Sequence, residues 1–189
     1  MKHNVERRQI MSVNNAVLET IRTRRSVRSF RNRPVEKDVL EAVVEAGRYA
    51  PTGMNRQDVW FFVTDKPELI RELSELNADV MKAANPSSKG DPFYHAPAVV
   101  AVLADASDPN WVKNGSLAMG NMMLAAHSLG LGSCWINRAD AVFDSEAGRG
   151  LLDGYGIPKN AAGVGFCILG YPGEEKEAAE RTSVVVEAL

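Results

Sequence analysis

The stretch NGSLAMGNMMLAAHSLGLGSCWI, residues 114–136, decides how the rest of the chain is arranged. Its first part, Asn114–Leu129, is apolar almost all round, which predicts a helix buried on every side. Gly130 is the residue type that commonly ends a helix in a left-handed turn. Gly132–Ile136 then predicts a short strand. A buried helix that leads directly into a strand is the expected centre of the fold.

Further strands and helices flank this stretch without an internal repeat or a linker, so we expect one domain over residues 1–189 with its core at about 14–186. Aromatic and β-branched runs predict three more strands, Val59–Thr64, Pro97–Ala104 and Gly163–Leu169. Apolar residues at helical spacing predict further helices at 13–22, 35–49, from Pro67 onward and at 140–152.

Small residues in the central helix allow another backbone to approach closely; they are Gly115, Ala118, Gly120, Ala125 and Ala126. Two interpretations stay open. The helix is either a core helix of one subunit or shared between a core and a dimer interface. The chain ends in Val184-Val185-Val186, a β-branched segment of the kind that can add to the sheet edge of a partner.

Composition excludes several classes of protein. The net charge is −2 and the hydrophobic fraction is 45%, which is typical of a globular domain and not of a generally basic nucleic-acid binder. The longest apolar run, Ala96–Ala104, is half of what a bilayer requires. Two cysteines and three histidines show no metal-ligand spacing. We expect a cytoplasmic protein that contacts no membrane and holds no metal.

Arginine is concentrated between Arg22 and Arg33. Six of the 22 basic residues of the chain lie in this stretch, which contains no acidic residue. The other 16 basic residues face 24 acids, so the rest of the chain carries about −8. Arginine forms bidentate bonds to phosphate oxygens, and Ser26 adds a hydroxyl. The run is therefore a solvated basic turn, a nucleic-acid patch or a compact site for one phosphate group.

The usual catalytic and nucleotide-binding motifs do not occur in the sequence, which has no G-x-S-x-G, C-x-x-C, P-loop or G-x-G-x-x-G after a strand. Cys134 is either a reactive thiol or a small packed side chain, and the latter is favoured; His95 and His127 are interpreted as structural. Phosphate-binding arginines with few acid–base candidates indicate that a cofactor supplies the chemistry. We therefore assign no catalytic side chain.

Four motifs, in order, resemble those of the FMN-dependent nitroreductase superfamily. They are Arg24-Arg25-Ser26-Val27-Arg28-Ser29-Phe30, Ala50-Pro51-Thr52-Gly53-Met54-Asn55-Arg56-Gln57, Leu129–Ile136 and Leu169-Gly170-Tyr171-Pro172. The resemblance covers roughly residues 14–186. It implies a three-layer α+β fold with a central, mainly antiparallel sheet flanked by helices, in an intertwined homodimer with FMN at the subunit interface. A strand contributed by the partner's tail would extend the small sheet.

The resemblance also implies which residues would contact FMN. Arg24, Arg25, Ser26 and Arg28 would hold the phosphate and ribityl chain, and Pro51, Thr52, Met54, Asn55 and Gln57 would line the flavin from the other subunit. Gly132, Ser133 and Cys134 would run along the ring, and Arg181 or Lys176 would return to the phosphate. Phe93 and Tyr94 would either stack on an aromatic substrate or anchor the 84–94 loop.

The implied activity is a ping-pong oxidoreductase that takes hydride from NADH or NADPH and reduces a small acceptor such as a nitroaromatic or a quinone. Two alternatives remain. One is a specialised flavoenzyme of the same superfamily, deiodinase-like or flavin-destroying. The other is a non-enzymatic module that binds anions or nucleic acid through the arginine run.

Overall fold

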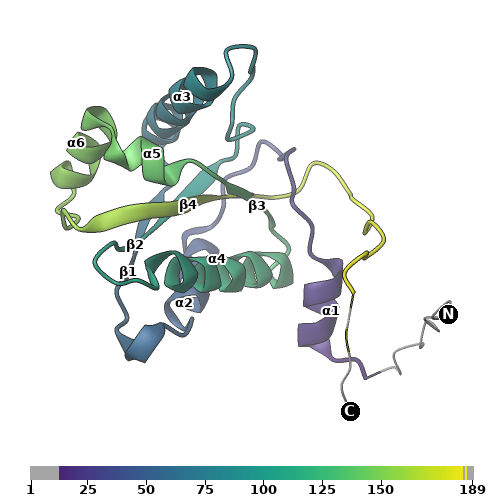
Figure 1. Cartoon of the computed structure of the whole chain (residues 1–189). Helices are drawn as coiled ribbons and strands as arrows, with labels where there is room; N and C mark the ends of the chain where they lie inside the picture. Colours follow the sequence, from purple (N-terminus) through teal and green to yellow (C-terminus); the bar gives the residue numbers. More distant parts are fainter. Residues whose placement is uncertain (1–12, 185, 187–189) are drawn as a thin grey trace, which may run out of the picture.

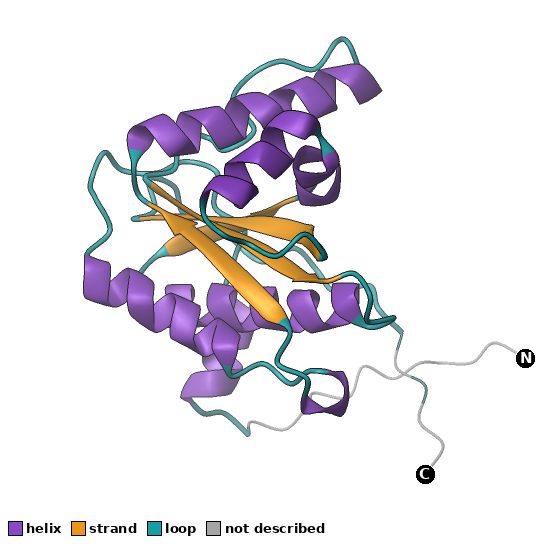
Figure 2. Ribbon diagram, turned by 90° about the vertical axis from the view of Figure 1, so that its left-hand side faces the viewer, coloured by secondary structure: helices purple, strands orange, loops and turns teal. Residues whose placement is uncertain are grey.

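A four-stranded sheet with helices on both sides forms the body of the protein (Figures 1 and 2). The computed structural model describes residues 13–184 and 186. The strand order is β1-β2-β4-β3, and every neighbouring pair is antiparallel. The strands are β1 (Val59–Thr64), β2 (Ala98–Asp105), β3 (Gly132–Ile136) and β4 (Ala161–Gly170). The helices are α1 (Ala16–Thr23), α2 (Lys37–Arg48), α3 (Pro67–Ala84), α4 (Trp111–Ser128), α5 (Ala139–Asp144) and α6 (Glu146–Gly154), with a 3₁₀ turn, η1, at Gly53–Asn55.

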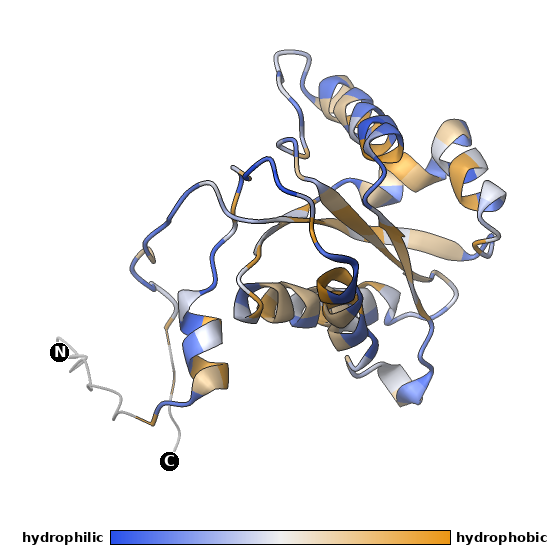
Figure 3. Ribbon diagram, turned by 180° about the vertical axis from the view of Figure 1, so that it is seen from behind, coloured by the Kyte–Doolittle hydropathy of each residue, from blue (hydrophilic) through white to orange (hydrophobic). Residues whose placement is uncertain are grey.

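The α+β prediction with an antiparallel sheet is confirmed, and β2 explains why helices cover both faces. Successive side chains of a strand point to opposite faces. In β2, Val99, Ala101 and Leu103 enter one apolar cluster, while Val100 and its even-numbered neighbours enter the other. All of them are completely buried. A strand that is apolar on both faces needs a helix layer on each side, and Figure 3 shows the sheet as an apolar layer between amphipathic helices.

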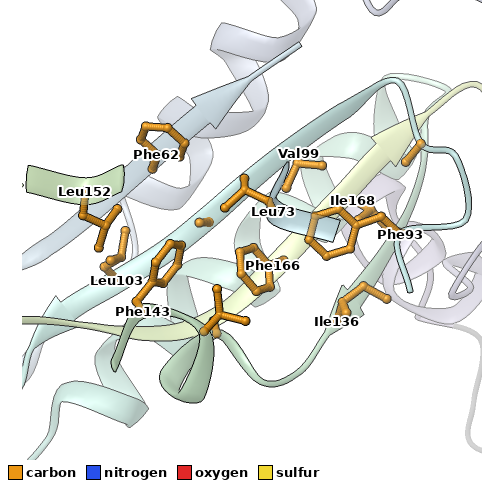
Figure 4. Packing of buried hydrophobic residues seen from close by; sticks show 14 of the residues in the cluster. Phe62, Leu73, Phe93, Val99, Leu103, Ile136, Phe143, Leu152, Phe166 and Ile168 are labelled. Atoms are coloured by element: carbon orange, nitrogen blue, oxygen red, sulfur yellow. The ribbon is translucent and has the colours of Figure 1, made fainter. Parts of the chain in front are cut away.

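The two helix layers differ in composition. On one face α3, α5 and α6 cover an aromatic cluster, in which Phe166 of β4 stacks against Phe93 and Phe143 at centroid distances of 5.1 and 5.4 Å (Figure 4). On the other face α2 and α4 pack with Met119 and Met122 completely buried. Gly47 lets α2 approach closely, because a Cβ there would lie 2.8 Å from Met122.

The junction between α4 and β3 follows the sequence prediction. Gly130 adopts φ 80°, the left-handed conformation that glycine tolerates. The backbone N–H of Gly130 donates to the carbonyl of His127, and that of Leu131 donates to the carbonyl of Ala126. This pair of bonds is a Schellman motif. It ends α4 and turns the chain directly into β3 at the edge of the sheet.

The predicted helix at 140–152 is wrong as a single element. Ser145 is extended, with φ −70° and ψ 152°, and separates α5 from α6. Its Oγ accepts from the N–H of Gly148 and caps α6. The two helices cross so closely at Gly148 that a Cβ there would lie 2.0 Å from the carbonyl oxygen of Val142. Helical periodicity continues through the break, and for that reason the sequence pattern hides it.

The chain after β4 runs outward toward α1 (Figure 1). It has no regular secondary structure where it is described, and Val184 and Val186 are exposed. Residue 185, residues 187–189 and residues 1–12 lie outside the described part. A strand contributed by this tail to a partner therefore stays a prediction. Within the described residues, none of the helices has the length and apolar character needed to cross a bilayer.

Candidate functional site

The arginine segment, residues 24–30, runs along the outer edge of β3. Ser26 forms a parallel bridge with Ser133, and the N–H of Val27 donates to the carbonyl of Ser133 at 3.0 Å. A Cβ on Gly132 would lie 2.8 Å from the Val27 side chain. The space that this glycine leaves is thus filled by the chain itself. Gly132 allows the segment to approach the sheet.

Four buried side-chain atoms of the described chain have no hydrogen-bond partner: three lie beside this contact, Arg24 Nη1, Arg25 Nε and Ser133 Oγ, and the fourth is the indole nitrogen of Trp135, farther along β3. An unsatisfied buried donor costs about 1–3 kcal/mol, so three of them in one place indicate that an acceptor is missing. Two are cationic and one is a hydroxyl, which is the donor set that suits a phosphate group. The residues present therefore fit an anionic group of this kind.

The segment after β4 adds a further cation. Lys176 Nζ donates to the carbonyl of Ser26 at 3.3 Å and pairs with Glu174 at 2.9 Å. Glu174 accepts from the backbone N–H of Arg28 at 2.6 Å, and this bond, followed by Lys176, lowers the pKa of Glu174. Arg181 is exposed farther along the extended chain. Of the two predicted basic residues, Lys176 is the one that lies against the arginine segment.

His127 borders the same cluster from α4. Its Nε2 lies 2.8 Å from Thr23 Oγ1. Partial burial, and then the positive charges of Arg24 and Arg25, lower the pKa of His127 below its ordinary value. The imidazole is therefore neutral at pH 7 and contributes no positive charge to the site, which agrees with the structural role expected for it.

The second predicted group, in the loop at residues 51–57, lies elsewhere. Figure 1 shows this loop, which contains η1, beside α2 and before β1, whereas the arginine segment follows α1 on the other side of the molecule. Met54, Asn55 and Gln57 all have positive φ, between 54° and 55°. Non-glycine residues rarely adopt this conformation, and such strain clusters at functional sites. Met54 is 96% exposed.

A buried polar network holds the strained loop in place, and sequence reasoning missed it. Asn114 of α4 is 2% exposed, and its Oδ1 accepts from the N–H of Gly53 at 3.0 Å. Its Nδ2 donates to Asp108 at 3.0 Å and to Asp58 at 3.3 Å. Three polar residues at 58, 108 and 114 show no motif in the sequence. Only the fold brings them together.

The loop borders a cavity of about 470 Å³ that includes Tyr49, Thr52, Asn55 and Gln57 in its lining. Thr52 Oγ1 accepts from the N–H of Gln57, and Gln57 Nε2 donates to Asn55 Oδ1. The polar side chains of the loop are thus ordered among themselves. Within one chain they do not meet the arginine segment.

The structure corrects the assignment of Phe93 to substrate contact. Phe93 is completely buried against Phe166, so it anchors the loop, which was the other interpretation (Figure 4). Tyr94 is 39% exposed and adopts φ 54°. Its ring lies 6.0 Å from the guanidinium of Arg28. Asp91 fixes this turn by accepting from the N–H groups of Phe93 and His95.

Cys134 is a packed side chain. It is 1% exposed and belongs to the aromatic cluster, so only its backbone is available along the edge of β3. Cys167 of β4 is also buried, and burial, followed by the proximity of Cys134, raises its pKa to about 12. Such a thiol does not form a thiolate at pH 7. No group of three His, Cys, Asp or Glu side chains in the described chain could hold a metal ion.

Two larger cavities flank the arginine segment. One, of about 550 Å³, lies beside the end of β3 and is lined by residues that include Arg28, Tyr94 and Arg138. The other, of about 860 Å³, lies between residues 30–35 and α3. In the larger cavity Arg33 pairs with Glu36 at 2.6 Å, and Arg31 Nε donates to the carbonyl of Pro172 at 3.0 Å. The smaller cavity shares Arg28 with the arginine segment, and its lining does not include Arg24, Arg25 or Ser133.

Comparisons with known proteins identify the family of this chain. Residues 21–171 match the family model described as the nitroreductase family. The chain belongs to the nitroreductase family. It is 32% identical over 168 residues to a protein of Archaeoglobus fulgidus, covering 86% of this chain and 89% of the relative. A protein of Methanothermobacter thermautotrophicus is 30% identical over 162 residues, covering 84% and 78%. Both relatives bear the provisional name NADH dehydrogenase/NAD(P)H nitroreductase.

A solved nitroreductase shares the fold over nearly the whole chain. The structure of a nitroreductase with bound FMN from Bacteroides fragilis superposes with a TM-score of 0.80 at 33% identity, covering 92% of this chain and all of that one. The nitroreductase-family match contains three of the four predicted motifs, and the fourth, Leu169–Pro172, extends one residue beyond its end.

Proposed function

We propose that this nitroreductase-family protein binds FMN and, as a homodimer, transfers electrons from NADH or NADPH to a small acceptor by a ping-pong mechanism. Nitroaromatics and quinones are the acceptors that we expect. The observation that carries the proposal is the set of buried, unpartnered donors on Arg24, Arg25 and Ser133. The FMN in the B. fragilis nitroreductase supports it, since the two chains share the fold at 33% identity.

The phosphate would lie at the arginine segment. A phosphate monoester carries about −1.5 to −2 charges at pH 7, and Arg24, Arg25, Arg28 and Lys176 supply the opposite charge. Charge-assisted bonds contribute roughly 1.5–3 kcal/mol each. Ser26 and Ser133 would supply hydroxyl donors. This concentration of positive charge in a chain that is otherwise acidic selects for an anionic cofactor over a neutral one.

FMN, when bound, supplies the centre that accepts and returns the hydride. The protein's own part is to bind and orient the cofactor. The edge of β3 at Gly132–Cys134 would present backbone groups to the ring, and the buried thiols would stay inert. The nearby cations would favour negative charge on the bound group. We assign no proton donor among the side chains, and water would supply the protons for the acceptor.

The homodimer part of the proposal rests on what the single chain leaves exposed. Leu117 on α4 is 50% exposed, and a Cβ on Gly120, one turn along, would meet no atom within 4 Å. Val17 and Ile21 of α1 are 65% and 51% exposed. Covering this apolar surface with a second copy would stabilise both chains. A partner would also bring its strained 51–57 loop to a site that one chain builds only in part.

The visible absorption spectrum of the purified protein tests cofactor binding. We expect a flavin spectrum, one FMN per chain after release by denaturation, and a dimer mass by light scattering. We also expect oxidation of NADH or NADPH that depends on an added nitroaromatic or quinone, with parallel lines in double-reciprocal plots. A colourless protein that does not take up added FMN would refute the proposal.

A further inference from the structure

Arg138 has an unusual conformation that no part of the proposed function uses. It lies two residues after the end of β3 and adopts φ 76°, a left-handed conformation that L side chains rarely occupy. Glycine would adopt it without strain. An arginine at such a position indicates that the side chain is needed there, because strained residues persist where the surroundings hold them in place.

A completely buried asparagine holds Arg138 in place. Asn77 of α3 has no exposed surface. Its Nδ2 donates to the carbonyl of Asn137 at 2.9 Å, and its Oδ1 accepts from Arg138 Nε at 3.0 Å. One side chain therefore orients both the backbone at the end of β3 and the guanidinium that follows. The guanidinium has lost most of its freedom before any ligand arrives, which reduces the entropic cost of binding.

The two terminal nitrogens of Arg138 remain available. Only Nε is engaged by the described chain, and no described carboxylate lies within 4.0 Å of the guanidinium. Arg138 lines the 550 Å³ cavity beside β3. Its planar pair of nitrogens matches the two oxygens of a carboxylate.

The rest of that cavity favours an aromatic anion. Lys89 and Arg28 also line it, while its acid, Asp91, is already engaged by Ser74, by two backbone N–H groups and by His95. Tyr94 offers a half-exposed ring at the cavity wall. An aromatic ring can pack against Tyr94 while its acidic group reaches Arg138.

We propose that Arg138 is a specificity-determining residue that binds the carboxylate of an aromatic acceptor, so that this nitroreductase prefers acceptors bearing an acidic group. The inference rests on the proposed function, since it names the acceptor class for a cavity that shares Arg28 with the proposed cofactor site. Asn77 is the positioning residue for Arg138.

The test compares two acceptors of nearly equal shape, 4-nitrobenzoate and 4-nitrobenzamide. The wild-type protein should have the higher kcat/KM for the benzoate. Arg138→Gln keeps a donor at the position of Nε, so the bond to Asn77 can persist, while the charge is lost. We expect this substitution to lower the benzoate-to-benzamide ratio of kcat/KM by roughly tenfold, mainly through KM for the benzoate.

Two further variants separate charge from structure. Arg138→Lys keeps the charge but loses the planar fork, so it should restore part of the preference. Arg149→Gln is the matched control, because Arg149 is also an arginine that donates to oxygens of the chain, here the backbone carbonyls of Pro158 and Ala161, but it lies on α6. It should leave the ratio unchanged. Thermal melting of all three variants checks that the fold is retained.

A binding measurement that needs no turnover completes the test. Calorimetric titration of the purified protein with benzoate and benzamide should show tighter binding of benzoate, lost in Arg138→Gln. An unchanged acceptor ratio and unchanged benzoate binding would overturn the inference, as would a rise of KM for NADPH alone, which would assign Arg138 to the donor's phosphate. A protein without flavin and without NAD(P)H oxidation would instead refute the proposed function, and the titration would still decide the role of Arg138.

Discussion

The arginine segment and the 51–57 loop reach an ordered state by opposite means. The segment at 24–30 pairs its backbone with β3 and leaves buried side-chain donors open. The loop satisfies its polar groups through Asn114 and Thr52 but holds three residues in a strained conformation. The first region offers charge without backbone strain, and the second offers a rigid shape with little charge. We infer that the arginine segment binds the phosphate group of the cofactor and that the 51–57 loop helps to position the cofactor.

The largest expected effect concerns the loop. Asn114→Ala removes the acceptor for Gly53 and leaves the buried Asp108 without its Asn114 partner. Losing the bond to Gly53 together with the buried bonds to the carboxylates of Asp108 and Asp58 costs about 3 kcal/mol. Urea unfolding should show a loss of that size. The control is Asn121→Ala, which removes a single bond to the carbonyl of Ala46 and should cost about 1 kcal/mol. Equal losses for the two variants would contradict the anchoring role.

The second prediction concerns the open donors. Arg24→Met keeps an unbranched stem like that of arginine but removes the charge and the unpartnered Nη1. FMN affinity should fall by about 10- to 100-fold, the equivalent of one charge-assisted bond. The flavin-free protein should be at least as stable as the wild type, because a buried unsatisfied donor is gone.

Fluorescence titration with FMN and thermal melting of the flavin-free protein measure the two quantities. Arg48→Met is a suitable control, since Arg48 is an exposed partner of Glu45. If Arg24→Met melted well below the wild type without flavin, Arg24 would be a structural residue.

A smaller effect is expected at the contact between the segment and the sheet. Gly132→Ala places a methyl group 2.8 Å from Val27 and pushes the arginine segment away from β3. Overpacking of this kind costs about 1–2 kcal/mol, and FMN affinity should fall with it. Gly150→Ala adds a methyl group in open space on α6 and should not destabilise the protein. Calorimetric melting of both variants distinguishes a required close approach from a general effect of removing glycine.

The smallest effect is a dependence on pH. Glu36 is bonded by the Tyr171 hydroxyl and by Arg33, and these bonds lower its pKa to about 2. The carboxylate therefore stabilises the folded state above pH 4.5, and this contribution is lost as the pH falls from about 4.5 to 2. As the pH is lowered through this range, the melting temperature of Glu36→Gln should decrease less steeply than that of the wild type. Parallel curves would show that the link between residues 33–36 and Tyr171 contributes nothing.

How far the sequence predicts the site depends on the kind of feature. The arginine cluster was visible because charge is a property of composition, and six arginines without an acid stand out. Asn77, Asp108 and Asn114 were not visible, because each is an ordinary polar residue until the fold buries it. Arg138 was missed for a related reason. Its role is inferred from its positive φ, and the neighbouring residues in the sequence do not predict that angle.

The sequence by itself determined which segments are apolar on one side or on both, where glycine ends α4, and that positive charge gathers near the start of the chain. These are local properties, because periodicity and turn chemistry act over a few residues. Only the tertiary structure decided that Phe93 is core and Tyr94 is surface, that α5 and α6 are separate helices, and that the arginine segment lies on β3 far from the 51–57 loop. Those outcomes depend on contacts between residues distant in sequence, where packing and burial override local preference.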